Sequence, residues 1–300
     1  MFIFLEHRDI DKKKWDASIE SSINKNIYAY SWFLDAVCPQ WTALVDENYK
    51  VLMPLPSRVK MGIHYLFEPF FAQQLGAFFK DEKDSKGIMD AIPAFYKYQV
   101  LKLNTSFHSV AKGFDILENL NYTLSLSKSY DELFKAYAYN TKRNVRKCSE
   151  DLILVSDFDD VQAINMFELN RGAKLANYRK EGSTVLVKLI KSLKEKKKLE
   201  KWAVLNKEGQ LLAAAHFAVF ENKRIFLFSA TDEDGKKERA MFFLIDRFIA
   251  KYANTNVLLD FSGSNDLDLA RFYSGFGADK EIYYRVVKNR LPLIIRWLKK

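Results

Sequence analysis

The chain has 300 residues, of which 48% are hydrophobic and 15% aromatic, enough for a substantial core in one large domain or two ordinary ones. Its 11 glycines are too few for a fold built on glycine-rich loops. The 47 basic residues outnumber the 38 acidic ones and give a formal charge of +9, which suits an anionic ligand such as coenzyme A, a nucleotide or tRNA. A solubilising surface explains the same balance, because most of the excess is lysine.

The cysteine and histidine content limits which metal cofactors and which cellular compartment we expect. The chain has two cysteines, Cys38 and Cys148, no Cys-x-x-Cys pair, and four scattered histidines, so we expect no metal site. The apolar run at the start is too short for a signal peptide, and no segment is long and apolar enough to cross a bilayer. We therefore expect a cytoplasmic protein with reduced thiols and no stable membrane insertion.

The first part of the chain alternates helical and extended patterns, without internal repeats or a low-complexity linker. Apolar spacing predicts helices, and alternating or buried runs predict strands. The predicted helices are 11–24, 31–38 (ended by Pro39) and 87–99; the predicted strands are 42–46, 50–56, 63–67, 74–79, 100–104 and 122–126.

A second alternation begins at Ser129, which can cap a helix with Glu132 three residues later, as in a capping box. Helices are predicted from 129, at 158–170, 182–198, 238–253 and 265–275, and strands at 201–206, 210–220, 223–230, 256–261 and 281–287. This order predicts an α/β (α+β) fold with a mixed sheet flanked by helices. The domain boundary is placed near 127, giving domains 1–127 and 128–300.

A polar loop, 231–239, follows the predicted strand 223–230 and leads into a helix. Lys236, Lys237 and Arg239 lie beside the start of that helix, where free N–H groups and the positive helix end favour anions. The loop is therefore a candidate pyrophosphate site, although a solvated turn explains the same residues.

Two further segments resemble known families. Residues 260–263 read Asp-Phe-Ser-Gly at a strand end, residues 272–277 read Phe-Tyr-Ser-Gly-Phe-Gly, and residues 141–147 read Thr-Lys-Arg-Asn-Val-Arg-Lys. Together they resemble the GNAT acyltransferase superfamily, and most closely the Fem-type peptidyltransferases; the match covers roughly 128–287. Segments of the first half, such as Pro-Phe-Phe-Ala-Gln-Gln-Leu-Gly at 69–76, are similar to uncharacterised GNAT-like proteins of Bacteroidetes type. The resemblance implies a GNAT-like mixed sheet and two GNAT-like lobes in tandem, the first degenerate.

The sequence departs from these families at two places. The usual GNAT pyrophosphate loop, Arg/Gln-x-x-Gly-x-Gly/Ala, does not align in register with residues 235–240, which weakens the case for coenzyme A. The tRNA-dependent relatives usually carry lysine where this chain has Tyr273, whereas tyrosine there is typical of GNAT enzymes that use coenzyme A. The second departure favours an acyl-CoA donor.

The resemblance implies a catalytic role for Tyr273, and the position of Asp260 at a strand end favours one for that residue. Tyr273 would protonate the departing thiolate, and Asp260 would act as base or orient the acceptor amine. The alternatives are a packed aromatic residue for Tyr273 and a cap of helix 265–275 for Asp260. Backbone N–H groups near Ser229 would polarise the thioester carbonyl.

Candidate substrate-binding residues are Gln73, Gln74 and Arg143. Gln73 and Gln74 are adjacent in a predicted strand and would point to opposite faces. Arg143 and Lys147 are one helical turn apart and form either a small anion-binding face or a solvated surface. His216, inside an apolar strand, is interpreted as a core histidine rather than a base.

We expect an N-acyltransferase that moves an acyl group from acyl-CoA to a small-molecule or peptide amine bound between the lobes. One alternative is an aminoacyl-tRNA-dependent peptidyltransferase of Fem type, with tRNA as the partner. Another is a non-catalytic GNAT-fold binding protein.

Overall fold

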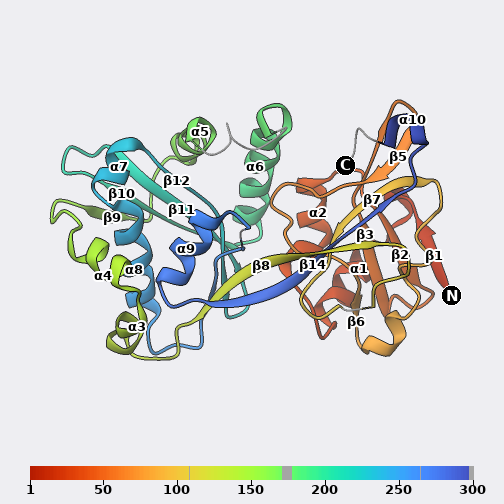
Figure 1. The fold of residues 1–300 in the computed structure, drawn as a ribbon, viewed down its shortest axis with the longest axis horizontal. Coiled ribbons are helices and arrows are strands. Elements are labelled where there is room, and N and C mark those ends of the chain that lie inside the picture. The colour runs from red at the N-terminus through yellow and green to blue at the C-terminus, as the bar shows by residue number, and fades with distance from the viewer. Residues whose placement is uncertain (108, 171–177, 264, 297–300) are drawn as a thin grey trace. The chain divides into compact units, whose positions relative to one another are not determined.

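The computed structural model describes residues 1–107, 109–170, 178–263 and 265–296 (Figure 1). The chain divides into two compact units, which we call unit 1 (residues 1–119 and 282–300) and unit 2 (residues 120–281). The boundary expected near 127 falls inside unit 2, and the last residues of the chain group with unit 1. Whether the units correspond to two GNAT-like lobes stays a prediction.

Unit 1 contains two sets of paired strands. Strands β1, β2, β3 and β6 form a sheet in that order, with antiparallel pairs throughout. In the second set β4 pairs with β5 antiparallel, β5 with β7 parallel, and β7 with β14 antiparallel. The elements are β1 (Phe2–Leu5), α1 (Lys12–Glu20), α2 (Ser31–Val37), β2 (Thr42–Asp46), β3 (Val51–Leu55), β4 (Ser57–Lys60), β5 (Ile63–Leu66), β6 (Phe78–Phe79), β7 (Tyr96–Lys102), β8 (Asp115–Ser125, which runs into unit 2), β14 (Asp279–Asn289, which begins in unit 2) and α10 (Leu293–Arg296).

Most of the predicted elements of unit 1 are confirmed. Helix α1 begins after Asp11, whose carboxylate accepts hydrogen bonds from the N–H groups of Lys13 and Lys14. The indole of Trp15 is fully buried and donates to the carbonyl of Ala29 over 2.8 Å. The helix is therefore fixed at its start by a cap and in its middle by a buried hydrogen bond.

The helix predicted at 87–99 is wrong. Turns occupy residues 87–95, and the extended strand β7 starts at Tyr96. Pro93 lacks the N–H that a helix needs, and Gly87 has φ +83°, outside the helical region. The predicted strand 74–79 is likewise reduced to β6, Phe78–Phe79.

Unit 2 is built on one mixed sheet whose strand order is β8-β13-β12-β11-β10-β9. Its elements, besides parts of β8 and β14, are α3 (Tyr130–Ala136), α4 (Tyr139–Arg146), β9 (Ile153–Val155), α5 (Asp160–Asn170), α6 (Tyr178–Glu195), β10 (Leu199–Leu205), β11 (Leu211–Phe220), β12 (Lys223–Thr231), α7 (Glu233–Lys237), α8 (Ala240–Tyr252), β13 (Leu258–Asp260) and α9 (Leu267–Gly275). The mixed α/β fold expected from the sequence is confirmed.

The capping box at the start of α3 is present, with Ser129 and Glu132 bonding each other's backbone. The helix predicted from 129 is in fact two helices, because Tyr137 and Ala138 are extended and separate α3 from α4. The N–H of Ala138 donates to the carbonyl of Gly275 over 2.8 Å, so the break also attaches this segment to the end of α9.

Strands β12 and β13 are parallel neighbours, as expected for a strand–helix–strand crossover through α8. Their pairing covers only residues 223–225 against 258–260. Strand β13 ends at Asp260 while β12 continues to Thr231, so the outer part of β12 has no β13 partner. We call this place, where the two strands separate, the fork.

Alternate residues of β11 face opposite sides of the sheet. Ala213, Ala215 and Phe217 join the larger core beside α8 and α9, and Phe217 stacks on Phe248 with ring centroids 4.3 Å apart. Ala214 joins a smaller cluster with Ala163 of α5. Helices thus cover both faces, and Figure 1 shows α8 alongside β10 and β11.

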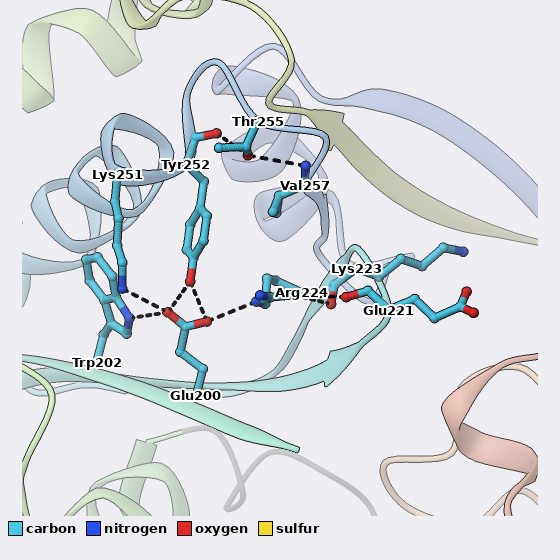
Figure 2. Close-up of polar contacts among 9 residues, drawn as sticks. All are labelled: Glu200, Trp202, Glu221, Lys223, Arg224, Lys251, Tyr252, Thr255 and Val257. Atoms are coloured by element: carbon cyan, nitrogen blue, oxygen red, sulfur yellow. Dashed lines mark hydrogen bonds and ion pairs between the residues drawn. The ribbon is translucent and has the colours of Figure 1, made fainter. Parts of the chain in front are cut away.

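A carboxylate at the start of β10 ties together three elements of unit 2 (Figure 2). Glu200 accepts hydrogen bonds from the indole of Trp202 at 2.9 Å, the hydroxyl of Tyr252 at 2.8 and 2.9 Å, and Arg224 Nε at 3.0 Å. Lys251 Nζ lies 3.4 Å away. Burial alone would raise the pKa of Glu200, but these donors outweigh it and hold the pKa below its usual range. The network joins β10, β12 and the end of α8 away from the fork.

The first prediction concerns the variant Glu200→Gln, which should lower the free energy of unfolding by about 2 kcal/mol, because one amide cannot satisfy four donors arranged for a carboxylate. The depressed pKa means that the stabilisation is present above the unfolded-state pKa and is lost as pH falls through the folded-state pKa, so the difference between wild type and variant should shrink as pH falls below the usual glutamate pKa. Denaturant titrations at several pH values measure this.

Glu208→Gln is the matched control, since Glu208 is exposed on the turn between β10 and β11. It should change stability by no more than about 0.5 kcal/mol. An equal effect of the two substitutions would show that the network does not stabilise unit 2.

Candidate functional site

Asp260 lies at the fork as the last residue of β13. Its side chain is buried, and Oδ1 accepts a hydrogen bond from the N–H of Ser262 at 2.8 Å. Burial raises the pKa of Asp260, and the hydrogen bond from Ser262, the charge of Lys223 and a contact with Asn121 oppose the rise only in part. The alternative role as a helix cap does not hold, because Asp266 caps α9.

A row of polar side chains on β8 lies beside Asp260 of β13. Thr123 is directly opposite Asp260 in the antiparallel β8–β13 register. Glu281 accepts hydrogen bonds from Thr123 Oγ1 and Asn121 Nδ2, both at 3.3 Å. The carboxamide oxygen of Asn121 is buried without a hydrogen-bond partner within the described part of the chain. Asn121 thus connects the buried carboxyl of Asp260 to the exposed carboxylate of Glu281.

Sequence reasoning missed Asn121, Thr123 and Glu281. The available signal was a polar alternation, since Asn119, Asn121 and Thr123 are all buried on one face of β8 while Tyr122 and Leu124 join the hydrophobic core. Buried polar residues in alternate positions of a strand indicate a wet or ligand-binding face.

Tyr273 is placed beside the fork by α9. Its ring is 6% exposed and stacks on Phe261, the residue after β13, with centroids 4.7 Å apart. The rings of Tyr122 and Phe226 lie 6.1 and 6.3 Å away. Phe226 is the first residue of β12 beyond the parallel pairing, so Tyr273 fills the angle where the two strands separate.

The loop expected to bind pyrophosphate contains a short helix, α7. Asp232 caps it through the N–H of Gly235. Lys236 pairs with Glu233 at 2.5 Å and Lys237 with Asp234 at 2.7 Å. Both lysines are therefore partly neutralised by exposed neighbours, which a bound anion would have to displace.

Arg239 has a different role from the two lysines. It adopts a left-handed conformation, with φ +61°, just before α8. Its Nε donates to Asn144 Oδ1 and its Nη1 to the carbonyl of Lys147, both at 3.3 Å. Arg239 thereby attaches the start of α8 to the basic helix α4, on which Arg143 is exposed.

The two segments that resemble Fem-type sequences, 141–147 and 272–277, contact each other. A Cβ on Gly275, at the end of α9, would lie 2.4 Å from Thr141 Oγ1 of α4, so only glycine fits without displacement. Together with the bond between Ala138 and Gly275, this contact packs α4 against α9. These two segments, which are far apart in sequence, therefore pack together beside the fork.

The remaining candidates lie in different units. Ser229 is on β12 beyond the parallel pairing, opposite Ala215 of β11. Gln73 and Gln74 belong to unit 1, where Gln74 is buried and its Oε1 accepts from the N–H of Thr105 at 3.3 Å.

His216 is fully buried, as interpreted from the sequence. Its Nε2 lies 2.8 Å from Asp160 Oδ1, and its ring stacks on Phe228 at 4.2 Å. Burial lowers the pKa of His216, more than the neighbouring carboxylate raises it. This histidine joins β11 to the start of α5.

Across the described segments, no three side chains of His, Cys, Asp or Glu are grouped so as to hold a metal ion. None of the helices in those segments has both the length and the apolar character needed to cross a membrane.

Comparisons with known proteins identify the fold. No family model matches the chain, and no curated protein matches it significantly. Among solved structures, FemX superposes with a TM-score of 0.66 and 11% identity, covering 97% of this chain and 99% of FemX. A conserved protein of unknown function from Bacteroides thetaiotaomicron VPI-5482 gives a TM-score of 0.58 and 12% identity, covering 96% and 99%. The chain therefore has the fold of FemX, and the expected likeness to Fem-type proteins is confirmed at the level of the fold.

Proposed function

We propose that the protein is an N-acyltransferase that uses an acyl-CoA donor and an amine acceptor. The observation that supports this most strongly is the fork, where β12 loses its β13 partner, the buried carboxyl of Asp260 ends β13, and the ring of Tyr273 stacks on the next residue, Phe261. An extended donor such as a pantetheine arm can bind along an unpaired strand edge through backbone hydrogen bonds. The N–H groups near Ser229 would then polarise the thioester carbonyl.

Asp260 is the proposed base, or the group that orients the amine. An acceptor amine must lose a proton when it attacks the thioester, and a base works best when its pKa is close to the working pH. Burial moves the pKa of Asp260 upward in that direction. Asn121, which contacts Asp260 and donates to the exposed carboxylate of Glu281, would hold the carboxyl of Asp260 in place.

Tyr273 is the proposed acid. When the tetrahedral intermediate collapses, the C–S bond breaks and the thiolate takes up a proton, which a phenol can donate. The position of the ring between Phe226 and Phe261 places it beside both strands of the fork. Its burial equally suits a packing role, so the hydroxyl has to be tested separately from the ring.

An aminoacyl-tRNA-dependent transferase is the second candidate. The fold shared with FemX and the exposed basic residues Arg143, Arg146 and Lys147 on and beside α4 favour it. The donors are distinguishable, since acyl-CoA needs the fork and the α7–α8 loop, whereas tRNA needs an extended basic surface.

The second prediction concerns donor binding. Replacing Lys236, Lys237 and Arg239 together by alanine should weaken acetyl-CoA and CoA binding by about tenfold or more, because charge-assisted contacts to phosphate are lost. Calorimetric titration measures the change, and the wild-type affinity should fall with added salt. A control triple variant, at exposed Lys188, Lys191 and Lys207, should bind as wild type does. Absence of acetyl-CoA and CoA binding by the wild type would leave the tRNA-dependent and non-catalytic alternatives.

The third prediction is that Asp260→Asn lowers turnover by on the order of 10²–10⁴-fold while the protein stays folded. The amide fills the same space and does not need to be desolvated as a charge, so stability should be unchanged or higher. Thiol release from acetyl-CoA, alone and with a panel of amines, follows turnover. Asp268→Asn, an exposed change on α9, is the control. Wild-type turnover by the Asp260 variant would exclude the base.

The fourth prediction separates the hydroxyl of Tyr273 from its ring. Tyr273→Phe keeps the stacking on Phe261 and should cost roughly 1 kcal/mol of stability or less. Loss of a general acid should nevertheless reduce thiol release by on the order of 10²-fold or more. Tyr122→Phe removes a hydroxyl from the same aromatic cluster and should leave the rate unchanged. If both variants turn over like wild type, Tyr273 serves packing alone.

A further inference from the structure

Unit 1 contains a cluster of charged residues, none of which belongs to the strands or helices that form the fork. In the antiparallel β7–β14 pair, Lys102 is directly opposite Arg285, so both side chains project from the same face. Glu68, in the segment after β5, accepts a hydrogen bond from Arg285 Nε at 2.8 Å. Tyr98 is on β7 four positions before Lys102 and points to the same face.

The charges of this cluster do not balance. Two cations face one carboxylate, and Glu68 is already bonded to Arg285. The ammonium of Lys102 makes no hydrogen bond or ion pair within the described residues, although its side chain is half-buried. Like charges directly opposite each other in a sheet are destabilising, and removing an unpaired ammonium from water is costly.

The pKa values of the cluster agree with this geometry. Burial lowers the pKa of Lys102, Arg285 lowers it further, and Glu68 offsets these effects only in part. Burial also raises the pKa of Tyr98, whose hydroxyl lies within the field of Arg285 and Glu68. The cluster therefore lies in a partly water-excluded place, where electrostatic contacts are stronger than at an open surface.

We propose that Lys102 and Arg285 form a binding site in unit 1 for an oxyanion, the phosphate or carboxylate group of a small ligand. A bound oxyanion would give Lys102 the partner it lacks and would separate the two facing cations. The side chains of Arg285 and Glu68 are 29% and 22% exposed, so the cluster is open to solvent. The site does not depend on the proposed transferase activity, because every residue in it belongs to unit 1.

The fifth prediction tests this site on the full-length protein. Inorganic phosphate and sodium acetate are titrated separately while the side-chain NMR signal of Lys102 is followed. The signal is assigned as the one missing from Lys102→Met and from Lys102→Arg. Saturable movement with phosphate at lower concentration than acetate assigns a phosphorylated ligand, and equal or tighter response to acetate assigns a carboxylate. A signal that neither anion moves would overturn the proposal.

Binding measured on the variants provides the second readout. Lys102→Met should weaken binding of the preferred anion on the order of tenfold to a hundredfold, because one charged hydrogen-bond donor is lost. Without anion its melting temperature should be equal to wild type or higher, since an unpaired ammonium has been removed. Lys102→Arg keeps the charge and should bind within a few-fold of wild type. Lys97→Met, at an exposed position of the same strand, is the matched control. Unchanged affinity in Lys102→Met would contradict the site, and failure of that variant to fold leaves Lys102→Arg and the wild-type signal to decide.

Discussion

The short parallel pairing of β12 with β13 is the constraint on which unit 2 depends. Three residues of each strand pair, and β13 then turns away at Asp260 into the left-handed backbone of Ser262. A strand edge left open inside a sheet would be unstable unless other groups covered it. In this chain the aromatic rings around Tyr273 fill the angle on one face, and polar residues of β8 line the other. Where the sheet is interrupted, apolar groups therefore cover one face and ionisable groups the other.

Two contacts keep the elements around the fork in position. Gly275 lets α9 approach Thr141 of α4, and Arg239 joins α4 to the start of α8. At the other end of α8, Tyr252 bonds Glu200, so the helix is held at both ends by side-chain hydrogen bonds. Packing of Phe248 on Phe217 fixes its middle. A helix restrained in this way gives the α7–α8 loop a defined backbone, which an anion site requires.

Local patterns predicted most of unit 2. The apolar strands β11 and β12 and the capping box of α3 could be predicted from residues that are near each other in sequence. The helix predicted at 87–99 is wrong because the prediction gave too little weight to Pro93, which interrupts a helix. It also missed the pairing of β7 with β14, a strand far along the chain. The polar group of Asn121, Thr123 and Glu281 was missed for the same reason, since no local pattern shows which distant side chains share a face.

The order of the units along the chain has a consequence for synthesis. Unit 1 begins the chain and also ends it, with unit 2 placed between. Strand β7 emerges from the ribosome long before β14, its antiparallel neighbour. The edge of β7 that pairs with β14 therefore stays unpaired while the whole of unit 2 is translated. A nascent chain that folds in sequence order would complete the second unit before the first. Truncation after residue 281 would remove most of β14, the partner of β7, from the first unit, whereas a fragment spanning residues 120–281 keeps all of the second.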